Sequence, residues 1–198
     1  MNKKIILFVA LETELPPLLL PEGVNVYYTG VGKVNAAMKA TEVLYSITDK
    51  STIVLNYGSA GSNTIPKGTL AKCTQFIQND MNTPFSTNHG TPFDELLDTP
   101  ITEPILDFGS GYVCRTQDRF EDNPTGIFDM EAYSLAKVCR FYGFNFTPYK
   151  YISDAGESAD WQENHSKGAK LFLDKLETLI NELHCEYSGL PSVKAYEK

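Results

Sequence analysis

Three carboxylates in this 198-residue sequence stand where acid–base chemistry could be done. Glu14 follows an apolar run, Glu131 opens a stretch with helical periodicity, and Asp154 closes another apolar run. Carboxyl groups in different environments can divide the work, because one can hold its proton as an acid while another stays ionised as a base. Each residue also has an ordinary explanation: a solvated loop acid, a charge at a helix N-terminus, and a cap.

Two Gly-rich turns add to this pattern. They are Thr29–Lys33 (TGVGK) and Asn56–Gly61 (NYGSAG), and each follows a predicted strand. Backbone N–H groups in such turns can approach an anion or a sugar closely. Neither turn completes the G-x-G-x-x-G fingerprint and the sequence has no Walker A loop, which argues against a dinucleotide or P-loop site.

Apolar strands alternate with amphipathic helices along the chain. The predicted strands are Lys4–Ala10, Val24–Tyr28, Thr52–Leu55, Thr69–Ile77, Gly111–Arg115, Ile127–Met130 and Phe146–Ile152. The predicted helices are Val34–Ser46, Glu131–Tyr142 and Glu163–His184, and 79–108 reads as a long loop. This alternation predicts a three-layer α/β domain. Polar or Gly-rich segments follow several strand ends, where open α/β sheets bind ligands.

Length and composition favour one domain, which we place over residues 1–185, with a loose tail at 186–198. The net charge of −8 and the lack of a basic stripe argue against nucleic-acid binding. The first apolar run is too short for a signal peptide, and no run predicts a membrane span. The four cysteines form no CxxC pair and no metal-ligand spacing, so we expect free thiols in a cytoplasmic protein that needs no cofactor or metal.

Four segments carry a family resemblance: Ala10–Leu15 (ALETEL), Thr29–Ala37 (TGVGKVNAA), Asn56–Gly61, and Phe128–Ala132 (FDMEA) with Ile152–Asp154 (ISD). In this order they resemble the 5′-methylthioadenosine/S-adenosylhomocysteine nucleosidases of the nucleoside phosphorylase superfamily. The resemblance implies an α/β fold, a three-layer α/β/α sandwich around a central mixed, partly barrelled β-sheet. It also implies a homodimer that hydrolyses the N-glycosidic bond of a purine nucleoside, one with a 5′ modification as in methionine salvage.

The resemblance assigns two catalytic residues and six substrate-binding residues. Glu14 matches the acid that activates water, and Asp154 matches the acid that protonates purine N7. The substrate-binding residues are Ser59, Gly61, Phe120, Met130, Glu131 and Ser153. Phe120 is expected to stack on the base, Met130 and Glu131 to hold the ribose, and Ser153 to support Asp154.

Chemistry fits these assignments. A proton on N7 makes the base a better leaving group, so Asp154 must be protonated near neutral pH, and burial favours that state. An ionised Glu131 would stabilise a cation-like sugar. Purine is favoured because an acid such as Asp154 can protonate N7, and because the sequence interpretation identifies no Gln-x-Arg recognition pair of the kind that pyrimidine-specific relatives use.

Two other functions stay open at this stage. A phosphorylase would hold phosphate with arginines near the first strand end and the second Gly-rich turn, but the sequence has Glu12 and Glu14 at the first place and no arginine at the second. Lys33 is a candidate phosphate ligand, although a solvated lysine is the favoured interpretation. A non-catalytic nucleoside-binding protein is the third hypothesis. Trp161 either covers the site or anchors a helix start, and the second role is favoured.

Overall fold

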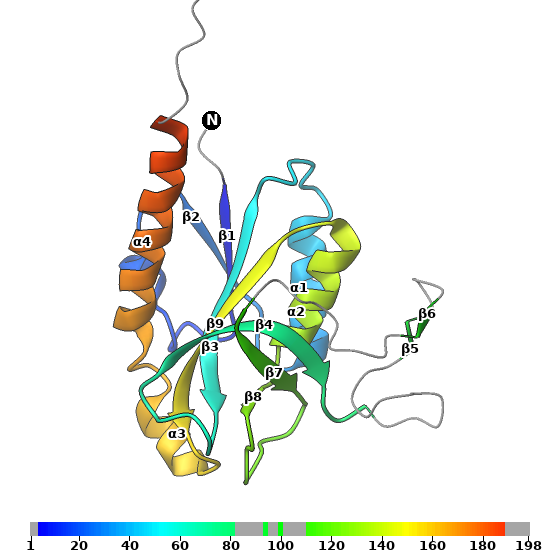
Figure 1. The fold of residues 1–198 in the computed structure, drawn as a ribbon, viewed down its shortest axis with the longest axis vertical. Coiled ribbons are helices and arrows are strands. Elements are labelled where there is room, and N and C mark those ends of the chain that lie inside the picture. Colours follow the sequence, from blue (N-terminus) through cyan, green and yellow to red (C-terminus); the bar gives the residue numbers. More distant parts are fainter. Residues whose placement is uncertain (1–3, 82–92, 95–98, 101–109, 189–198) are drawn as a thin grey trace, which may run out of the picture.

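A mixed β-sheet at the centre of the chain carries the ends that form the candidate site (Figure 1). The computed structural model describes residues 4–81, 93–94, 99–100 and 110–188. Within these ranges the main sheet has the order β2-β1-β3-β8-β7-β4-β9. Its strands are β1 (Ile5–Val9), β2 (Val24–Tyr28), β3 (Ile53–Gly61), β4 (Leu70–Gln78), β7 (Tyr112–Thr116), β8 (Ile127–Asp129) and β9 (Phe146–Asp154).

The sheet closes on itself in part. β9 pairs with β4 at one edge and also with β3, so the run from β3 through β8, β7 and β4 returns to β3. β1, β2, β3 and β9 run parallel to one another, whereas β8 is antiparallel to β3 and β4 is antiparallel to β9. The predicted mixed, partly barrelled sheet is therefore confirmed. A separate pair of short strands, β5 (Phe93–Asp94) and β6 (Thr99–Pro100), completes the set.

Helices cover both faces of the sheet and form the outer layers (Figure 1). They are α1 (Lys33–Leu44), α2 (Ala132–Tyr142), α3 (Ser158–Asn164) and α4 (Ala169–Ser188), with a short 3₁₀ turn η1 (Pro17–Leu19). α1 and α2 pack side by side on one face, and α4 lies on the other. None of the helices in the described part of the chain is long and apolar enough to cross a membrane.

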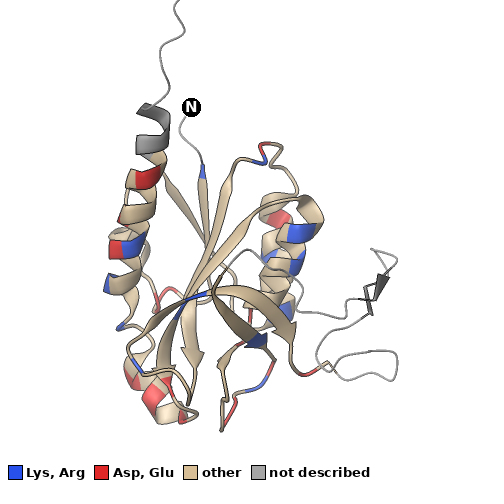
Figure 2. Cartoon of the chain, in the orientation of Figure 1, with Lys and Arg blue, Asp and Glu red and all other residues tan. Residues whose placement is uncertain are grey.

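Strand β1 shows how the two cores form. Ile6 and Phe8 belong to the core shared with α1 and α2, while Leu7 and Val9 belong to the core shared with α4. Successive strand residues point to opposite faces, so a strand covered on both sides must be apolar throughout. Charged residues accordingly lie mainly on helices and connecting loops (Figure 2).

The structure corrects three sequence predictions. The segment Gly58–Gly61 is not a turn but the end of β3, because pairing with β9 continues through it and outweighs the weak strand preference of glycine. Ser153 and Asp154 likewise belong to β9. The single helix predicted over Glu163–His184 is two helices.

The two helices are separated at Gly168, where the chain passes against Tyr151. A Cβ on Gly168 would lie 2.2 Å from that ring, so only glycine fits. α4 then continues to Ser188, into the segment predicted as a tail. Residues 189–198 and most of the predicted 79–108 loop lie outside the described residues.

Candidate active site

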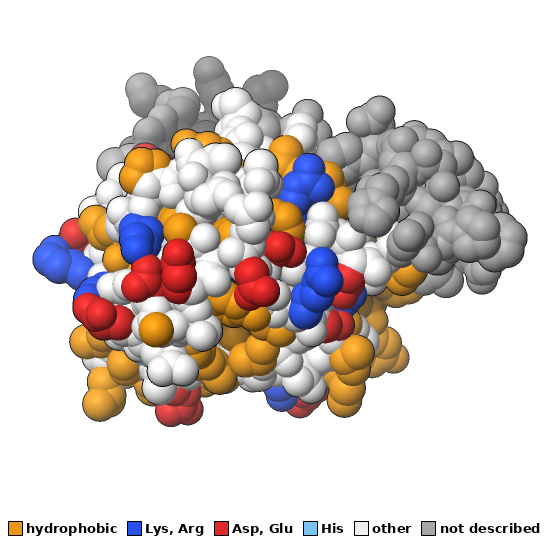
Figure 3. Space-filling model, turned by 90° about the horizontal axis from the view of Figure 1, so that it is seen from below, with side chains coloured by type: hydrophobic (Ala, Val, Ile, Leu, Met, Phe, Trp, Pro, Cys, Tyr) orange, Lys and Arg blue, Asp and Glu red, His pale blue; other side chains and the backbone are white. Residues whose placement is uncertain are grey.

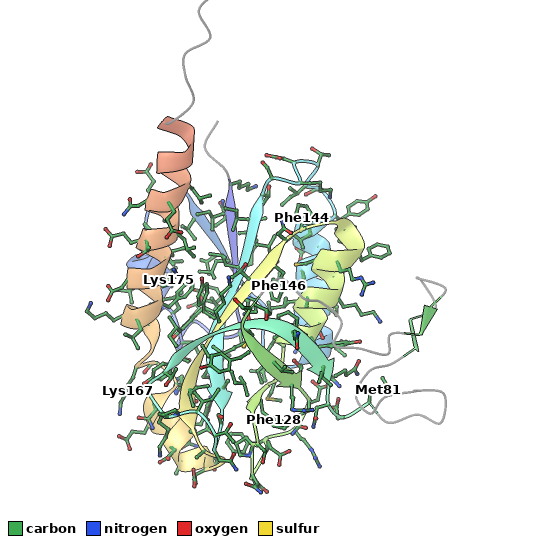
Figure 4. The ribbon with its side chains drawn as sticks, viewed as in Figure 1. Met81, Phe128, Phe144, Phe146, Lys167 and Lys175 are labelled. Carbon is green, nitrogen blue, oxygen red and sulfur yellow. The ribbon has the colours of Figure 1, made fainter. Side chains whose placement is uncertain are left out.

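The three carboxylates singled out in the sequence line one pocket of about 240 Å³. Glu14 follows β1, Asp154 ends β9, and Glu131 follows β8. The wall also includes Ser59, Ala60 and Gly61 of β3, and the remaining lining residues are Ala10, Leu11, Val31, Arg119, Phe120, Glu121, Phe128, Asp129, Met130 and Trp161. Figure 3 views the end of the molecule where β3 ends, and Figure 4 labels Phe128 at that end of the sheet. The ends of strands far apart in sequence thus meet in one place, as the sequence predicted.

Glu14 is almost fully buried, with 3% of its surface exposed, and its two carboxylate oxygens are held differently. Oε1 accepts hydrogen bonds from the Ser59 backbone N–H at 2.8 Å and from the Ser59 hydroxyl at 2.6 Å. Oε2 accepts a longer bond of 3.3 Å from the Leu11 N–H. Ser59 Oγ in turn accepts a bond of 3.0 Å from Trp161 Nε1. This arrangement leaves Oε2 as the less occupied oxygen of the carboxylate.

Asp154 is 1% exposed, so the burial expected at the end of its strand is confirmed. Its Oδ2 accepts a hydrogen bond from Ser153 Oγ at 2.8 Å, and its Oδ1 accepts one from the Gly156 N–H at 3.0 Å. Gly61 lies against it, since a Cβ there would be only 2.9 Å from Asp154 Oδ1. Ser153 does not line the pocket but fixes the carboxyl group that does.

Glu131 stands at the N-cap of α2 and reaches across to the start of α1. Its Oε1 accepts a hydrogen bond of 2.9 Å from the Gly32 N–H. Gly30 and Gly32 have φ of 75° and 97°, a conformation that favours glycine and that turns this N–H toward the carboxylate. Burial, together with the charges of Asp129 and Glu14, raises the pKa of Glu131 to about 8. At neutral pH this pKa favours the protonated form of Glu131, whereas the ionised form expected from the sequence is the one paired with sugar hydroxyls.

A buried ion pair lies beneath the pocket. Lys150 Nζ is 2.7 Å from Asp129 Oδ2, and both side chains are almost fully inaccessible to solvent. Although burial opposes the charges of both groups, their mutual attraction dominates. It holds the pKa of Asp129 below its usual value and raises the pKa of Lys150. A Cβ on Gly58 would be 3.4 Å from Lys150 Nζ and 3.8 Å from Glu14 Oε1, so both side chains border the position of Gly58.

Asp129 ties this pair to the start of α2. Its Oδ2 accepts the Ala132 N–H at 2.7 Å and the Glu131 N–H at 3.3 Å, and its Oδ1 accepts the Thr116 hydroxyl at 2.5 Å. These bonds satisfy N–H groups of the first turn, which have no partner inside the helix. The backbone of Glu131 is therefore fixed by a charge that Lys150 compensates.

The segment after β7 forms another part of the wall. Phe120 lines the pocket with 42% of its surface exposed, and Arg119 and Glu121 flank it. Gln117 and Arg119 make a Gln-x-Arg pair that the sequence interpretation overlooked. Gln117 is fully buried, donates to Arg119 O and Glu121 Oε2, and accepts from Asn79 Nδ2 at 2.7 Å. Its amide is committed to the protein and is absent from the pocket wall.

Cationic side chains are scarce in the described lining of the pocket. Five carboxylates line it against the single guanidinium of Arg119, and that group pairs at 3.6 Å with Glu121. Lys33, the candidate phosphate ligand, instead pairs with Asp80 at 2.5 Å and with Asp118 at 3.5 Å. The described lining therefore offers no unpaired cation to hold a phosphate dianion. Within the described residues there is no group of three or more His, Cys, Asp or Glu side chains that could hold a metal ion.

The structure brings together all eight predicted site residues. Seven line the pocket, namely Glu14, Ser59, Gly61, Phe120, Met130, Glu131 and Asp154, and Ser153 contacts Asp154. Trp161 stands near the start of α3, and its ring also lines the pocket and donates to Ser59, so its position fits both interpretations. The sequence reasoning also missed the Asp129–Lys150 pair, for which the only signal was an aspartate inside the FDMEA segment and a lysine inside an apolar strand.

No protein-family model matches the sequence. A curated 5′-methylthioadenosine/S-adenosylhomocysteine nucleosidase of Bacillus velezensis is 29% identical over 169 residues, which cover 70% of this chain and 72% of the relative. The solved futalosine hydrolase of Helicobacter pylori aligns with a TM-score of 0.76 and 19% identity over 92% of this chain and 99% of its own. A nucleosidase of Colwellia psychrerythraea, solved in complex with adenine, aligns with a TM-score of 0.70 and 17% identity over 93% and 96% of the two chains.

Proposed function

We infer that this chain is a nucleosidase-like member of the nucleoside phosphorylase superfamily and that it hydrolyses the N-glycosidic bond of a purine nucleoside. The observation that carries this proposal is the meeting of Glu14, Glu131 and Asp154 in one pocket. The similarity to nucleosidases in sequence and in fold supports it. A domain over residues 1–185 would contain the whole site.

In the proposed reaction the bond between C1′ of the sugar and N9 of the base breaks, and the electron pair goes to the base. Asp154 delivers a proton to N7, which makes the base a neutral leaving group. Its two hydrogen bonds, from Ser153 and Gly156, hold the carboxyl group in a fixed orientation toward the pocket. Phe120 offers an aromatic face on which the purine can stack.

Glu131 and Met130 would hold the ribose. Positive charge develops on the sugar in the transition state, and an ionised Glu131 stabilises that charge. Hydroxyl donors and the developing cation both lower the pKa of this carboxyl group, which burial has raised. Glu131 would therefore bind its proton less tightly as the bond breaks, so its stabilising effect is largest in the transition state.

Water is the proposed nucleophile. Glu14 takes a proton from the water as its oxygen bonds to C1′, and Oε2 is the oxygen with room to accept it. Among the described residues, Arg119 is the only cationic group in the lining and it is paired with Glu121, which supports water over phosphate as the nucleophile. The alternative is a phosphorylase, and the experiment must distinguish phosphate from water as the nucleophile.

The test is a nucleoside panel in phosphate-free buffer, with release of free base as the readout. The panel contains 5′-methylthioadenosine, S-adenosylhomocysteine, futalosine, adenosine, inosine and uridine. We expect base release from a purine nucleoside, and no gain in rate when phosphate is added. Strict dependence on phosphate would identify a phosphorylase, and tight binding without cleavage would identify a binding protein.

Two variants and one control assign the roles. Asp154→Asn and Glu14→Gln should each lower turnover by roughly 10²–10⁴-fold, the usual range for losing an acid or a base. Glu12→Gln is the matched control, because this exposed carboxylate lies two residues from Glu14 and does not line the pocket. Turnover of Asp154→Asn near the wild-type rate would refute the role given to that residue.

We also propose a homodimer. Val34 and Met38 lie one turn apart on α1 with 69% and 67% of their surfaces exposed, and Val31, just before this helix, lines the pocket. A second copy covering this face would reach the pocket mouth, and light scattering should give twice the chain mass.

The cytoplasm is the proposed location, because the described cysteines are free thiols. Methionine salvage is the proposed role if 5′-methylthioadenosine proves to be the best substrate.

A further inference from the structure

We propose that Trp161 is a positioning residue whose indole N–H, acting through the Ser59 hydroxyl, orients the Glu14 carboxylate for attack on the sugar. The proposal rests on the proposed function, because it concerns how the general base of that reaction is held. It adds a residue on α3 to the catalytic arrangement and gives Ser59 a defined task.

The hydrogen bonds in this chain can run in only one direction. Indole nitrogen is a donor and never an acceptor, so Ser59 Oγ must accept the bond of 3.0 Å from Trp161 Nε1. The single proton of the hydroxyl is then available for Glu14 Oε1, which lies 2.6 Å away. Trp161 therefore turns Ser59 into a donor aimed at the carboxylate.

This direction matters for the carboxylate. With two bonds from Ser59 on Oε1, the plane of the carboxyl group is fixed and Oε2 is left with one long bond from Leu11. A base that is held in one orientation needs little reorganisation when it accepts a proton. Without the indole donor, the Ser59 hydroxyl could rotate away, and Glu14 would lose its shortest hydrogen bond.

The position of Trp161 links the base to the acid. α3 begins four residues after Asp154 and packs against β9, so only a short connection separates the strand that ends at Asp154 from the helix that carries Trp161. The indole also stacks on His165, with ring centroids 4.8 Å apart and an angle of 23° between the rings. A phenylalanine at this position can keep that stacking but cannot donate to Ser59, which makes Trp161→Phe an informative variant.

The first experiment needs no turnover. Trp161 is the only tryptophan in the chain, so a ¹H–¹⁵N spectrum contains one indole N–H resonance. We expect Ser59→Ala and Glu14→Gln both to shift this resonance, whereas Glu131→Gln should leave it in place. A resonance that is insensitive to Glu14→Gln would show that the indole does not report on the carboxylate and would overturn the proposal.

The second experiment is a double-mutant cycle on a nucleoside that the wild-type protein cleaves. Trp161→Phe should lower kcat by about tenfold, the effect expected for one hydrogen bond to a charged network, with a smaller change in KM. In the Ser59→Ala background the same substitution should cost almost nothing more, because the indole acts through the hydroxyl. An unchanged kcat in the single variant, or a full tenfold loss that persists without Ser59, would overturn the proposal.

The two arms separate the failure of this proposal from the failure of the proposed function. If no nucleoside is cleaved by the wild-type protein, the proposed function fails, and the indole resonance still decides whether the contact chain exists. If the wild-type protein cleaves a nucleoside while either arm gives the contrary result, the proposed function stands and the role of Trp161 falls.

Discussion

Replacing Lys150 by methionine tests the electrostatics beneath the pocket. Lys150 is fully buried, and its ammonium group lies 2.7 Å from Asp129. Methionine has a similar length and no charge, so Lys150→Met removes the partner of Asp129 with little change in volume. The variant leaves a buried carboxylate without a counter-charge.

The expected cost follows from the remaining contacts. Removing one member of a buried ion pair typically destabilises a protein by about 3–5 kcal/mol. Asp129 still accepts bonds from Thr116 at 2.5 Å and from Ala132 at 2.7 Å, and these bonds stabilise its charge. We therefore expect the lower end of that range, about 3 kcal/mol at pH 8.

The cost should depend on pH in a definite direction. In the wild-type protein the charge of Lys150 holds the pKa of Asp129 below its usual value. The same charge opposes part of the rise in the pKa of Glu131. Loss of Lys150 therefore raises the pKa of both carboxyl groups. A raised carboxyl pKa favours the folded state at low pH and destabilises it as the pH rises. The difference in unfolding free energy between Lys150→Met and the wild type should therefore shrink from pH 8 to pH 5.

Urea unfolding at pH 5 and at pH 8 measures this difference. The double variant Lys150→Met with Asp129→Asn is the matched control, because it removes both charges and should recover much of the lost stability at pH 8. A cost below about 1 kcal/mol at pH 8, or a double variant no more stable than Lys150→Met, would contradict the view that Lys150 compensates a buried charge.

Three further predictions concern single positions. Since burial raises the pKa of Glu131 from 4.5 to about 8, its ionisation destabilises the fold as the pH rises across that range. Glu131→Gln should thus gain up to about 5 kcal/mol in urea unfolding at pH 9 and only about 1 kcal/mol at pH 5, at about 1.4 kcal/mol per pKa unit, and equal gains would contradict this explanation. Gly61→Ala places a Cβ 2.9 Å from Asp154 Oδ1 and should reduce base release about 100-fold by displacing that carboxyl group, while secondary structure by circular dichroism stays unchanged. Tyr57 is fully buried, stacks on Phe172 and has no hydrogen-bond partner for its hydroxyl among the described residues, so Tyr57→Phe should be neutral or gain up to about 1 kcal/mol, and a loss of 2 kcal/mol would reveal a partner.

Local sequence features predicted the order of the elements and most of the site. Apolar runs and helical periodicity are short-range signals, so strands such as Val24–Tyr28 were predicted with the bounds that the structure has. The site residues could be named because they stand at the ends of such elements, in segments whose order matches a known family. The sequence also indicated that a ligand would bind where the strands end.

Tertiary structure decided the features that depend on distant partners. β3 continues through Gly58 and Gly61 because β9 pairs with it, and no local signal contains that pairing. Lys150 and Asp129 are brought together by β9 and β8, and the donor from Trp161 reaches Ser59 across 102 positions in the sequence.

The ionisation of Glu131 has the same origin. Its pKa depends on burial and on the charges of Asp129 at the end of β8 and Glu14 after β1, which residue type and spacing alone do not contain. Residue types and their periodicity determine which groups are available for chemistry. Their hydrogen-bond direction and charge state follow from solvent exclusion and from neighbours that only the folded chain supplies.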